Sequence, residues 1–468
     1  MSKTCHITIK DEVRAVIAGL HPSDIDFLWN KFGIFVEGYF FMPEYKLGRF
    51  DGKVRFFEKT GRTYIRLLHE IIPYLEKWGY DIELNDKRIP VDNPTERITS
   101  DHFKQFNINL RGYQVDSINE CLDAGSGFII AGTGAGKSVM CAGLCDMYGR
   151  AGYRTMTIVP SSDLVTQTAE WYIACGMEAG EYSGAKKEIH AQHVVATWQS
   201  LQNNPHVMEN FGMLIVDEAH GAKANVVQRL IADHGKNIPF RFGFTGTFPK
   251  PESDKTSLIA TIGPVLKEIP ARWLIDNGYL AEIDIECIRL KDQTFEDGDF
   301  PDYASEKAFL IKSEGRLDKI ADIIIDRCEK YGNTLVLVNS VDFGERLQAL
   351  IKDSVFLYGE SKKNVRKTHY DEFAEKNDLI VIATAGIAAQ GISIDRVFCL
   401  ILVDAGKSFV RAIQSVGRGT RLADDKKMVN VVDIGADLKW SKKHMNERMK
   451  YYKEAGYHYS KPTTIKIK

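Results

Sequence analysis

Short apolar runs alternate with amphipathic stretches along most of the chain after residue 106. The runs occupy residues 128–131, 155–159, 193–197, 213–216 and 241–244 in one half, and 334–338, 355–358, 379–383, 400–403 and 429–432 in the other. Apolar runs of this length are typical of strands buried on both faces, and strands that alternate with helices form parallel sheets. The pattern therefore predicts an α/β fold with two tandem parallel-sheet lobes.

The first 95 residues follow a different pattern, which predicts a small separate α/β domain. Helical periodicity covers residues 12–32 and 67–78, and a short strand follows at residues 80–84. Residues 90–97 contain two prolines and no apolar periodicity, so we interpret them as a linker.

The dipeptide Asp51-Gly52 predicts a β-hairpin within this domain, with strands at residues 47–50 and 53–57. In such a hairpin Lys53 and Arg55 share a face with aromatic residues, a combination that can bind phosphates and stack on unpaired bases. The alternative is a solvated face with scattered exposed aromatics, which is common on protein surfaces.

These patterns divide the chain into four predicted parts. They are a small N-terminal α/β domain at residues 1–95, a first lobe at 96–288, a second lobe at 289–435, and a basic C-terminal helix and tail at 436–468. The last part is rich in lysine. It either binds phosphate groups or forms an ordinary solvated helix and tail.

A glycine-rich segment at residues 132–136 follows the first apolar run and ends in Lys137 and Ser138. A strand, a glycine-rich turn and a helix over residues 139–147 are the context of a phosphate-binding loop, in which backbone N–H groups and the helix N-terminus bind a polyphosphate. Lys137 can reach the outer phosphates, and the Ser138 hydroxyl can hold Mg²⁺. In isolation such a segment can also be a plain glycine-rich turn.

Two carboxylates, Asp217 and Glu218, follow the apolar run at residues 213–216. This places them at the carboxyl edge of the predicted sheet, where open α/β folds bind ligands. Asp217 is a candidate Mg²⁺ ligand and Glu218 a candidate group to position the attacking water, as phosphoryl transfer requires. The alternative is an acidic helix cap after a strand.

Arg418 and Arg421 lie three residues apart and can reach the same anion from one face of a helix or turn. They are candidate arginine fingers, which stabilise charge in a phosphoryl-transfer transition state. The alternative is a solvated basic helix face.

Composition narrows the protein class further. The formal net charge is −2, so nucleic-acid binding must rest on local basic clusters. The eight cysteines form no C-x-x-C pair, which argues against a zinc site and a disulfide framework. The apolar runs are far shorter than the ~18 residues of a membrane span, and the N-terminus is too polar for a signal peptide. We expect a soluble cytoplasmic protein with no membrane contact.

In their order along the chain these segments resemble the motifs of superfamily 2 helicases over residues 110–432. The matching segments are residues 110–114, 131–138, 157–167, 196–200, 217–220 (the DEAH sequence), 244–249, 334–341, 382–393 and 414–421. That family commonly begins its phosphate loop with alanine, as Ala131 does here. Ser393 stands where its motif V usually carries an aspartate, and Asp395 follows. The resemblance implies two RecA-like lobes that bind ATP with Mg²⁺ between them.

The resemblance also implies roles for individual residues. Those expected to contact the nucleotide are Arg111, Gln114, Thr133, Gly134, Ala135, Gly136, Lys137, Ser138 and Gly391. Those expected to act in catalysis are Lys137, Asp217, Glu218, Arg418 and Arg421, with Ser138 and Asp217 holding the metal. Those expected to contact nucleic acid are Pro160, Gln167, Thr197, Gln199, Asn339 and Thr384, besides Lys53 and Arg55 of the hairpin. Those expected to couple the two sites are His220, Thr245, Thr247 and Gln414.

Within the superfamily, the DEAH sequence and the TGT segment are more similar to the DNA-directed branches than to the DEAD-box RNA helicases. The resemblance implies a monomeric ATP-dependent DNA helicase or translocase that remodels stalled forks and recombination junctions, with RNA–DNA hybrids as a further candidate substrate. Its candidate DNA partners are branched, duplex and single-stranded. The N-terminal domain is then expected to supply the preference for branched DNA. The alternatives are an RNA helicase and a nucleic-acid clamp that does not hydrolyse ATP.

Overall fold

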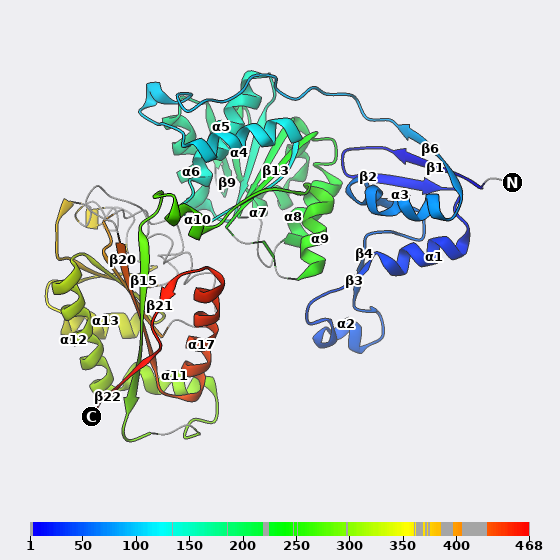
Figure 1. Cartoon of the computed structure of the whole chain (residues 1–468). Coiled ribbons are helices and arrows are strands. Elements are labelled where there is room, and N and C mark those ends of the chain that lie inside the picture. The colour runs from blue at the N-terminus through cyan, green and yellow to red at the C-terminus, as the bar shows by residue number, and fades with distance from the viewer. Residues whose placement is uncertain are drawn as a thin grey trace. The chain divides into compact units, whose positions relative to one another are not determined.

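The computed structural model describes most of the chain. The described residues are 3–132, 134–184, 186–218, 224–246, 248–249, 251–295, 298–359, 361, 368–369, 372, 375–384, 396–404 and 428–467. They form two compact units, one made of Met1–Ala131 with Gly136–Ile269 and the other of Gly132–Ala135 with Pro270–Lys468 (Figure 1). Among the described helices, none combines the length and the apolar character that a bilayer crossing requires.

The first unit begins with a small α/β domain. Its sheet has the order β5-β2-β1-β6. The strands are β1 (Lys3–Ile9), β2 (Arg14–Ala18), β5 (Arg62–Tyr64) and β6 (Tyr80–Asp86), and the longer helices are α1 (Pro22–Lys31) and α3 (Leu68–Lys77). Leu28 of α1 and Ile71 and Leu75 of α3 are buried in the same core as the strands. The predicted helix over residues 67–78 and the strand after it are confirmed.

The predicted helix over residues 12–32 is wrong in its first half, which forms β2. Alternate residues of that strand, Ala15 and Ile17, are buried, so the period is two and not 3.6. Helix α1 starts later because Pro22, at its first position, fits a helix N-terminus without losing a hydrogen bond.

The predicted hairpin around Asp51-Gly52 is also wrong. Strand β4 (Lys53–Arg55) pairs antiparallel with β3 (Gly33–Phe35), and residues between them form the turn η1 (Tyr39–Phe41) and the helix α2 (Pro43–Lys46). The Asp51 carboxylate accepts the Lys53 N–H at 3.1 Å, so the Asp-Gly turn does form. It joins the loop after α2 to β4, and the residues predicted as the first hairpin strand, 47–50, instead form a turn in which the Arg49 N–H donates to the Glu44 carbonyl at 2.9 Å. We call residues 33–55 the aromatic insert.

The second part of this unit is an α/β lobe with the sheet order β10-β9-β11-β8-β12-β13-β7-β14. Its strands are β7 (Ser126–Ala131), β8 (Thr155–Val159), β9 (Ala179–Ser183), β10 (Lys186–Lys187), β11 (His193–Thr197), β12 (Met213–Asp217), β13 (Phe240–Thr245) and β14 (Val265–Ile269). Among the described strand pairs of this sheet, only β9–β10 is antiparallel. All five predicted strands of this lobe are confirmed.

Helices cover both faces of this sheet (Figure 1). Helices α4 (Gly112–Ala124), α5 (Lys137–Arg150) and α6 (Ser162–Ala174) lie on one face, and α7 (Trp198–Asn203), α8 (Ala224–Asp233) and α9 (Glu252–Thr261) lie on the other. The lobe also has the short 3₁₀ helices η3 (Lys104–Phe106) and η4 (Pro205–Asn210), while η2 (Ile65–Leu67) belongs to the N-terminal domain. The side chains of the central strands are buried between the two helical layers, as continuous apolar runs predict.

The N-terminal domain and this lobe share a buried contact. The Arg241 guanidinium, in β13, is fully buried and donates to the carbonyls of Thr261 at 2.8 Å and Glu12 at 2.7 Å. The side chain of Val13 belongs to the core of the lobe. A chain cut at the predicted boundary near residue 95 would leave this arginine without one of its acceptors, so the N-terminal domain is part of the same compact unit.

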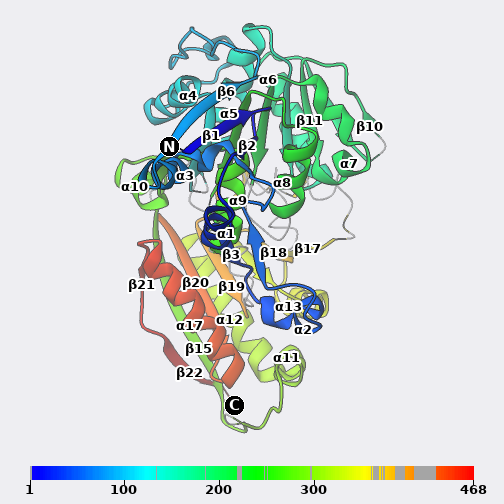
Figure 2. The same cartoon turned by 90° about the vertical axis from the view of Figure 1, so that its right-hand side faces the viewer.

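The second unit is another α/β lobe, with helices on both faces of its sheet (Figure 2). The sheet order is β17-β18-β16-β19-β20-β15-β21, and β22 also pairs with β15. The strands are β15 (Glu282–Asp292), β16 (Thr334–Val338), β17 (Val355–Leu357), β18 (Ile380–Thr384), β19 (Cys399–Val403), β20 (Met428–Ala436), β21 (His458–Tyr459) and β22 (Thr463–Ile467), and the helices are α10 (Ala271–Asp276), α11 (Tyr303–Lys312), α12 (Glu314–Tyr331), α13 (Val341–Leu350) and α17 (Lys439–Glu454). The five predicted strands of this lobe are confirmed.

Two predicted boundaries of the second lobe differ from the structure. The unit starts at Pro270, and a boundary after residue 288 would cut through β15, whose whole length pairs with β20 or β22. The C-terminal segment is no free tail, since β22 joins the sheet. In α17, Arg448 is buried and donates to the Asp433 carboxylate at 2.7 and 2.9 Å, so this cation stabilises the lobe and is not available to phosphates.

A buried histidine should make the first unit sensitive to mild acid. His193 in β11 is 2 % exposed, and burial lowers its pKa to about 4, while its Nδ1 lies 2.8 Å from the Thr155 hydroxyl. Between pH 6.5 and pH 4 the His193 imidazole is protonated in the unfolded chain and stays neutral in the folded one. Its contribution to the free energy of unfolding is therefore fully present above pH 6.5 and is lost as the pH falls through that window.

We expect the unfolding free energy to fall by about 2 kcal/mol more between pH 7 and pH 5 in the wild type than in His193→Gln. Urea denaturation of both proteins at the two pH values measures this difference, and equal losses would contradict it.

Candidate functional site

Three of the predicted catalytic residues, Lys137, Asp217 and Glu218, lie at the carboxyl edge of the first lobe's sheet. Strand β7 ends at Ala131, directly before the glycine-rich loop, and β12 ends at Asp217. Strand β13 pairs with both and ends at Thr245. Because parallel strands all end at the same edge, residues from three distant segments of the chain meet there.

The loop after β7 leads into helix α5 in the way a phosphate site requires. Gly136 has φ of 77° and is the N-cap, and Lys137 and Ser138 form the first turn of the helix. The Lys137 ammonium donates to the Ala131 carbonyl at 3.3 Å and lies 3.5 Å from Glu218 Oε1. The lysine is therefore held between the loop and the carboxylate that follows β12.

Glu218 has an unusual backbone conformation, with φ of 51°. A non-glycine residue in this region is strained by about 1–3 kcal/mol, and such strain concentrates at functional sites. Its N–H donates to Asp217 Oδ1 at 3.0 Å, and three-quarters of its side chain is buried. In this conformation the Glu218 carboxylate lies 3.5 Å from the Lys137 ammonium.

These residues fit ATP and Mg²⁺. The exposed Ser138 hydroxyl and the Asp217 carboxylate supply the oxygen ligands that Mg²⁺ prefers, and Lys137 at the start of α5 supplies the cation and the helix N-terminus for phosphates. Bound Mg²⁺ would neutralise phosphate charge as it develops.

Gln114 ties helix α4 to the phosphate loop. Its Oε1 accepts the Arg111 N–H at 2.9 Å as part of a capping box, and the residue is 4 % exposed. A Cβ at Gly136 would lie only 2.3 Å from Gln114 Nε2, so this position requires glycine for close approach as well as for its positive φ. The predicted nucleotide contacts of Arg111 and Gln114 stay predictions.

The predicted nucleic-acid residues of the first lobe lie at the same edge of the sheet. Pro160 and Gln199 follow the ends of β8 and β11, Gln167 lies in α6, and all three are exposed. Thr197 is different, since it is 4 % exposed and its hydroxyl accepts the Ser200 N–H at 3.3 Å as the N-cap of α7. The Thr197 side chain therefore caps a helix and is not presented to a ligand.

In the second lobe Asn339 follows β16 and Thr384 ends β18, again at the carboxyl edge of a parallel sheet. Asn339 is exposed, and its Nδ2 donates to the Asp404 carbonyl at 2.6 Å. Thr384 is half-buried.

Seven of the predicted site residues lie outside the described residues, and they are Thr133, His220, Thr247, Gly391, Gln414, Arg418 and Arg421.

The two basic residues of the predicted hairpin have different surroundings. The Arg55 side chain is 13 % exposed, its guanidinium lies 3.8 Å from the centre of the Trp29 ring, and it pairs with Asp51. Arg55 thus holds β4 in place. Lys53 is more accessible, and its ammonium lies 4.5 Å from the centre of the Phe35 ring. The sequence prediction missed the exposed aromatics Phe40 and Phe41, although the run Tyr-Phe-Phe at residues 39–41 is visible in the sequence.

The comparisons with known proteins find helicases. The family model "Type III restriction enzyme, res subunit" matches residues 107–250, and "Helicase conserved C-terminal domain" matches residues 315–423. The chain is 24 % identical over 461 residues to the ATP-dependent DNA helicase UvsW of Enterobacteria phage T4, which covers 90 % of this chain and 88 % of the phage protein. It is 28 % identical over 367 residues to the putative DNA 3'-5' helicase Rad25 of Halobacterium salinarum, over 75 % of this chain and 58 % of that protein.

A solved structure shares the fold of the two lobes. It is a fragment of a putative HsdR subunit of a type I restriction enzyme from Vibrio vulnificus, which superposes with a TM-score of 0.58 at 19 % identity over 76 % of this chain and 68 % of that one. The two helicase family models, the ordered motifs and the paired parallel-sheet lobes agree with one another. The chain therefore has both helicase domains, is similar to the superfamily 2 helicases and is an ATP-dependent helicase.

Proposed function

We propose that this helicase acts on DNA and unwinds or branch-migrates branched structures such as stalled forks and recombination junctions. The observation that supports this most is the common sheet edge in the first lobe, where Lys137, Asp217 and Glu218 lie beside the exposed residues after β8 and β11. The residues that bind the phosphates are therefore separated by only a few residues from a nucleic acid bound at the ends of the neighbouring strands. A movement of the first group can be transmitted to the second. DNA is the proposed substrate because UvsW and Rad25, to which the chain is similar, are described as DNA helicases.

The ion pair between Lys137 and Glu218 suggests how hydrolysis starts. At 3.5 Å the ammonium neutralises the carboxylate while no phosphate is near. Phosphates compete for the same ammonium, so ATP binding releases Glu218 to accept a hydrogen bond from the attacking water. Ser138 and Asp217 hold Mg²⁺ in this scheme. ATP binding itself therefore activates the carboxylate.

The aromatic insert is the proposed element that recognises the branch point. Phe35, Phe40 and Phe41 are 49, 52 and 72 % exposed. The rings contact one another, with centroid separations of 4.7 Å for Phe35–Tyr39, 5.6 Å for Tyr39–Phe40 and 4.3 Å for Phe40–Phe41. Three exposed rings connected through the half-buried Tyr39 form a larger aromatic surface than the scattered aromatics of an ordinary protein surface. Unpaired bases at a fork offer matching flat faces, and the Lys53 ammonium beside Phe35 suits the phosphate between them.

The function is tested by substrate preference. We expect ATP hydrolysis to be stimulated more by a three-way DNA fork than by linear duplex or by RNA of equal length, and we expect the fork to be regressed in the presence of ATP. Stronger stimulation by RNA would make the chain an RNA helicase. Binding to DNA without hydrolysis under all conditions would make it a clamp.

Variants of the insert separate branch recognition from the motor. The double variant Phe40→Ala/Phe41→Ala should slow fork regression by about 10-fold or more, because each stacked base contributes about 1–3 kcal/mol. Its ATPase rate on long single strands should stay within about two-fold of wild type, since both lobes are intact. Leu47→Ala is the matched control, being an aliphatic residue of the same insert that is 65 % exposed. Fork regression at the wild-type rate by the double variant would assign the insert a structural role.

A further inference from the structure

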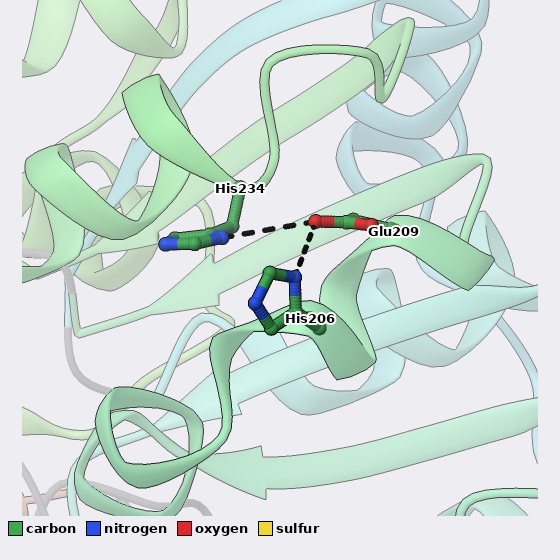
Figure 3. Close-up of side chains that lie close together, drawn as sticks. All are labelled: His206, Glu209 and His234. Atoms are coloured by element: carbon green, nitrogen blue, oxygen red, sulfur yellow. Dashed lines mark hydrogen bonds and ion pairs between the residues drawn. The ribbon is translucent and has the colours of Figure 1, made fainter.

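Three side chains converge on the first lobe, away from the ATP site. His206 and Glu209 belong to η4, and His234 follows α8 (Figure 3). Glu209 Oε1 lies 2.9 Å from His206 Nδ1 and 3.8 Å from His234 Nδ1. One nitrogen or oxygen atom from each residue lies within 4.8 Å of the others. Two imidazoles and a carboxylate thus share one small volume.

The position of this cluster separates it from catalysis. The turn η4 precedes β12, and His234 lies between α8 and β13, so the cluster is at the amino edge of the sheet. Asp217 and Lys137 lie at the opposite, carboxyl edge. A ligand of the cluster therefore has no direct access to the phosphates of ATP.

The donor set selects a chemical class of ligand. Two histidines and a glutamate are a ligand set that Zn²⁺ uses, with water in the fourth position, whereas Mg²⁺ prefers oxygen ligands alone. In a tetrahedral Zn²⁺ site with bonds of about 2.0–2.2 Å, ligand atoms lie roughly 3.4 Å apart. The His206 and Glu209 side chains are 74 and 53 % exposed, so small rotations can bring the three atoms to that spacing and leave room for water.

We propose that His206, Glu209 and His234 form a binding site for a divalent transition-metal ion of the Zn²⁺ class, which fastens η4 to the segment after α8. The cysteine pattern pointed away from zinc, but this ligand set uses no cysteine and combines two residues of η4 with a histidine that follows α8.

The metal would also stabilise the contact with the N-terminal domain. Asp233, next to His234, pairs with Arg14 at 2.7 Å. The carbonyl of Lys236 accepts the Glu12 N–H at 2.8 Å. Both contacts join the N-terminal domain to the segment that carries His234. Fixing that segment at His234 therefore reduces the motion of the surface on which the domain docks.

Calorimetric titration of the full chain with ZnCl₂ tests the site. We expect saturable binding of one ion, which weakens by about 100-fold or more in His234→Ala and in Glu209→Gln, because even changes beyond the direct ligands cost 10–100-fold. MgCl₂ should give no such binding. His69→Ala is the control, since His69 is 74 % exposed, as His206 is, and lies on the same unit outside the cluster. Equal affinity in wild type and His234→Ala, or no saturation in the wild type, would leave the cluster a surface ion pair and overturn the proposal.

Hydrogen exchange tests the fastening role and distinguishes it from adventitious binding. Zn²⁺ should slow exchange of amides at residues 234–241 and of the Glu12 amide in the wild type, and should not do so in His234→Ala. Unchanged exchange on saturation would overturn the coupling to the N-terminal domain. The result is independent of the proposed DNA function, because ATP hydrolysis with Mg²⁺ alone should be the same in His234→Ala and wild type.

Discussion

The variant Glu218→Gln is expected to bind ATP at least as tightly as the wild type and to hydrolyse it about 10²–10⁴-fold more slowly. Glutamine keeps the size of the side chain but cannot take a proton from water. It also removes the negative partner 3.5 Å from Lys137, so the ammonium is freer to hold phosphates. Nucleotide titration and steady-state ATPase rates at saturating ATP measure the two effects. The ATP-bound variant should also stay on DNA longer than the wild type does.

A second substitution in the same ion pair should differ from Glu218→Gln in its ATP affinity. Lys137→Ala removes the cation that binds the phosphates, so it should lose both affinity and turnover. The control Lys104→Ala, an exposed lysine of the same lobe, should change neither. Turnover by Glu218→Gln near the wild-type rate would show that another group positions the water.

The buried strands could be predicted from the sequence because their burial is continuous. Residues 155–159, 193–197 and 334–338 are strands with the predicted bounds, and every residue in them is buried. The strands that were missed mix polar and apolar residues, as in β9 (Ala179–Ser183) and β14 (Val265–Ile269). The pairing partner of β14 is β7, which lies far away in the sequence. Local patterns carry little information about such partners.

The same limit applies to single residues. Lys137 and Glu218 come together as expected, because a strand end fixes where the next side chains lie. Thr197 and Arg55 have suitable chemistry for binding nucleic acid. In the structure, however, Thr197 caps helix α7 and Arg55 packs against the Trp29 ring. The cluster of His206, Glu209 and His234 has no sequence signature, since its members meet only when η4 and α8 pack on the same sheet edge.

The largest effect in the second lobe is expected for Arg418→Ala and Arg421→Ala. As arginine fingers, these residues would contact the transferred phosphate mainly in the transition state, so each substitution should lower the turnover of ATP by about 10³-fold or more. Interactions made only in the transition state change the rate and leave ground-state affinity nearly intact. ATP affinity should therefore stay within a few-fold of wild type, as measured by titration with a non-hydrolysable analogue. Arg396→Ala, in the same lobe, is the control and should hydrolyse ATP normally. A large loss of affinity with full turnover at saturating ATP would instead make Arg418 and Arg421 ordinary nucleotide ligands, because their contacts would then be equally strong before and during phosphoryl transfer.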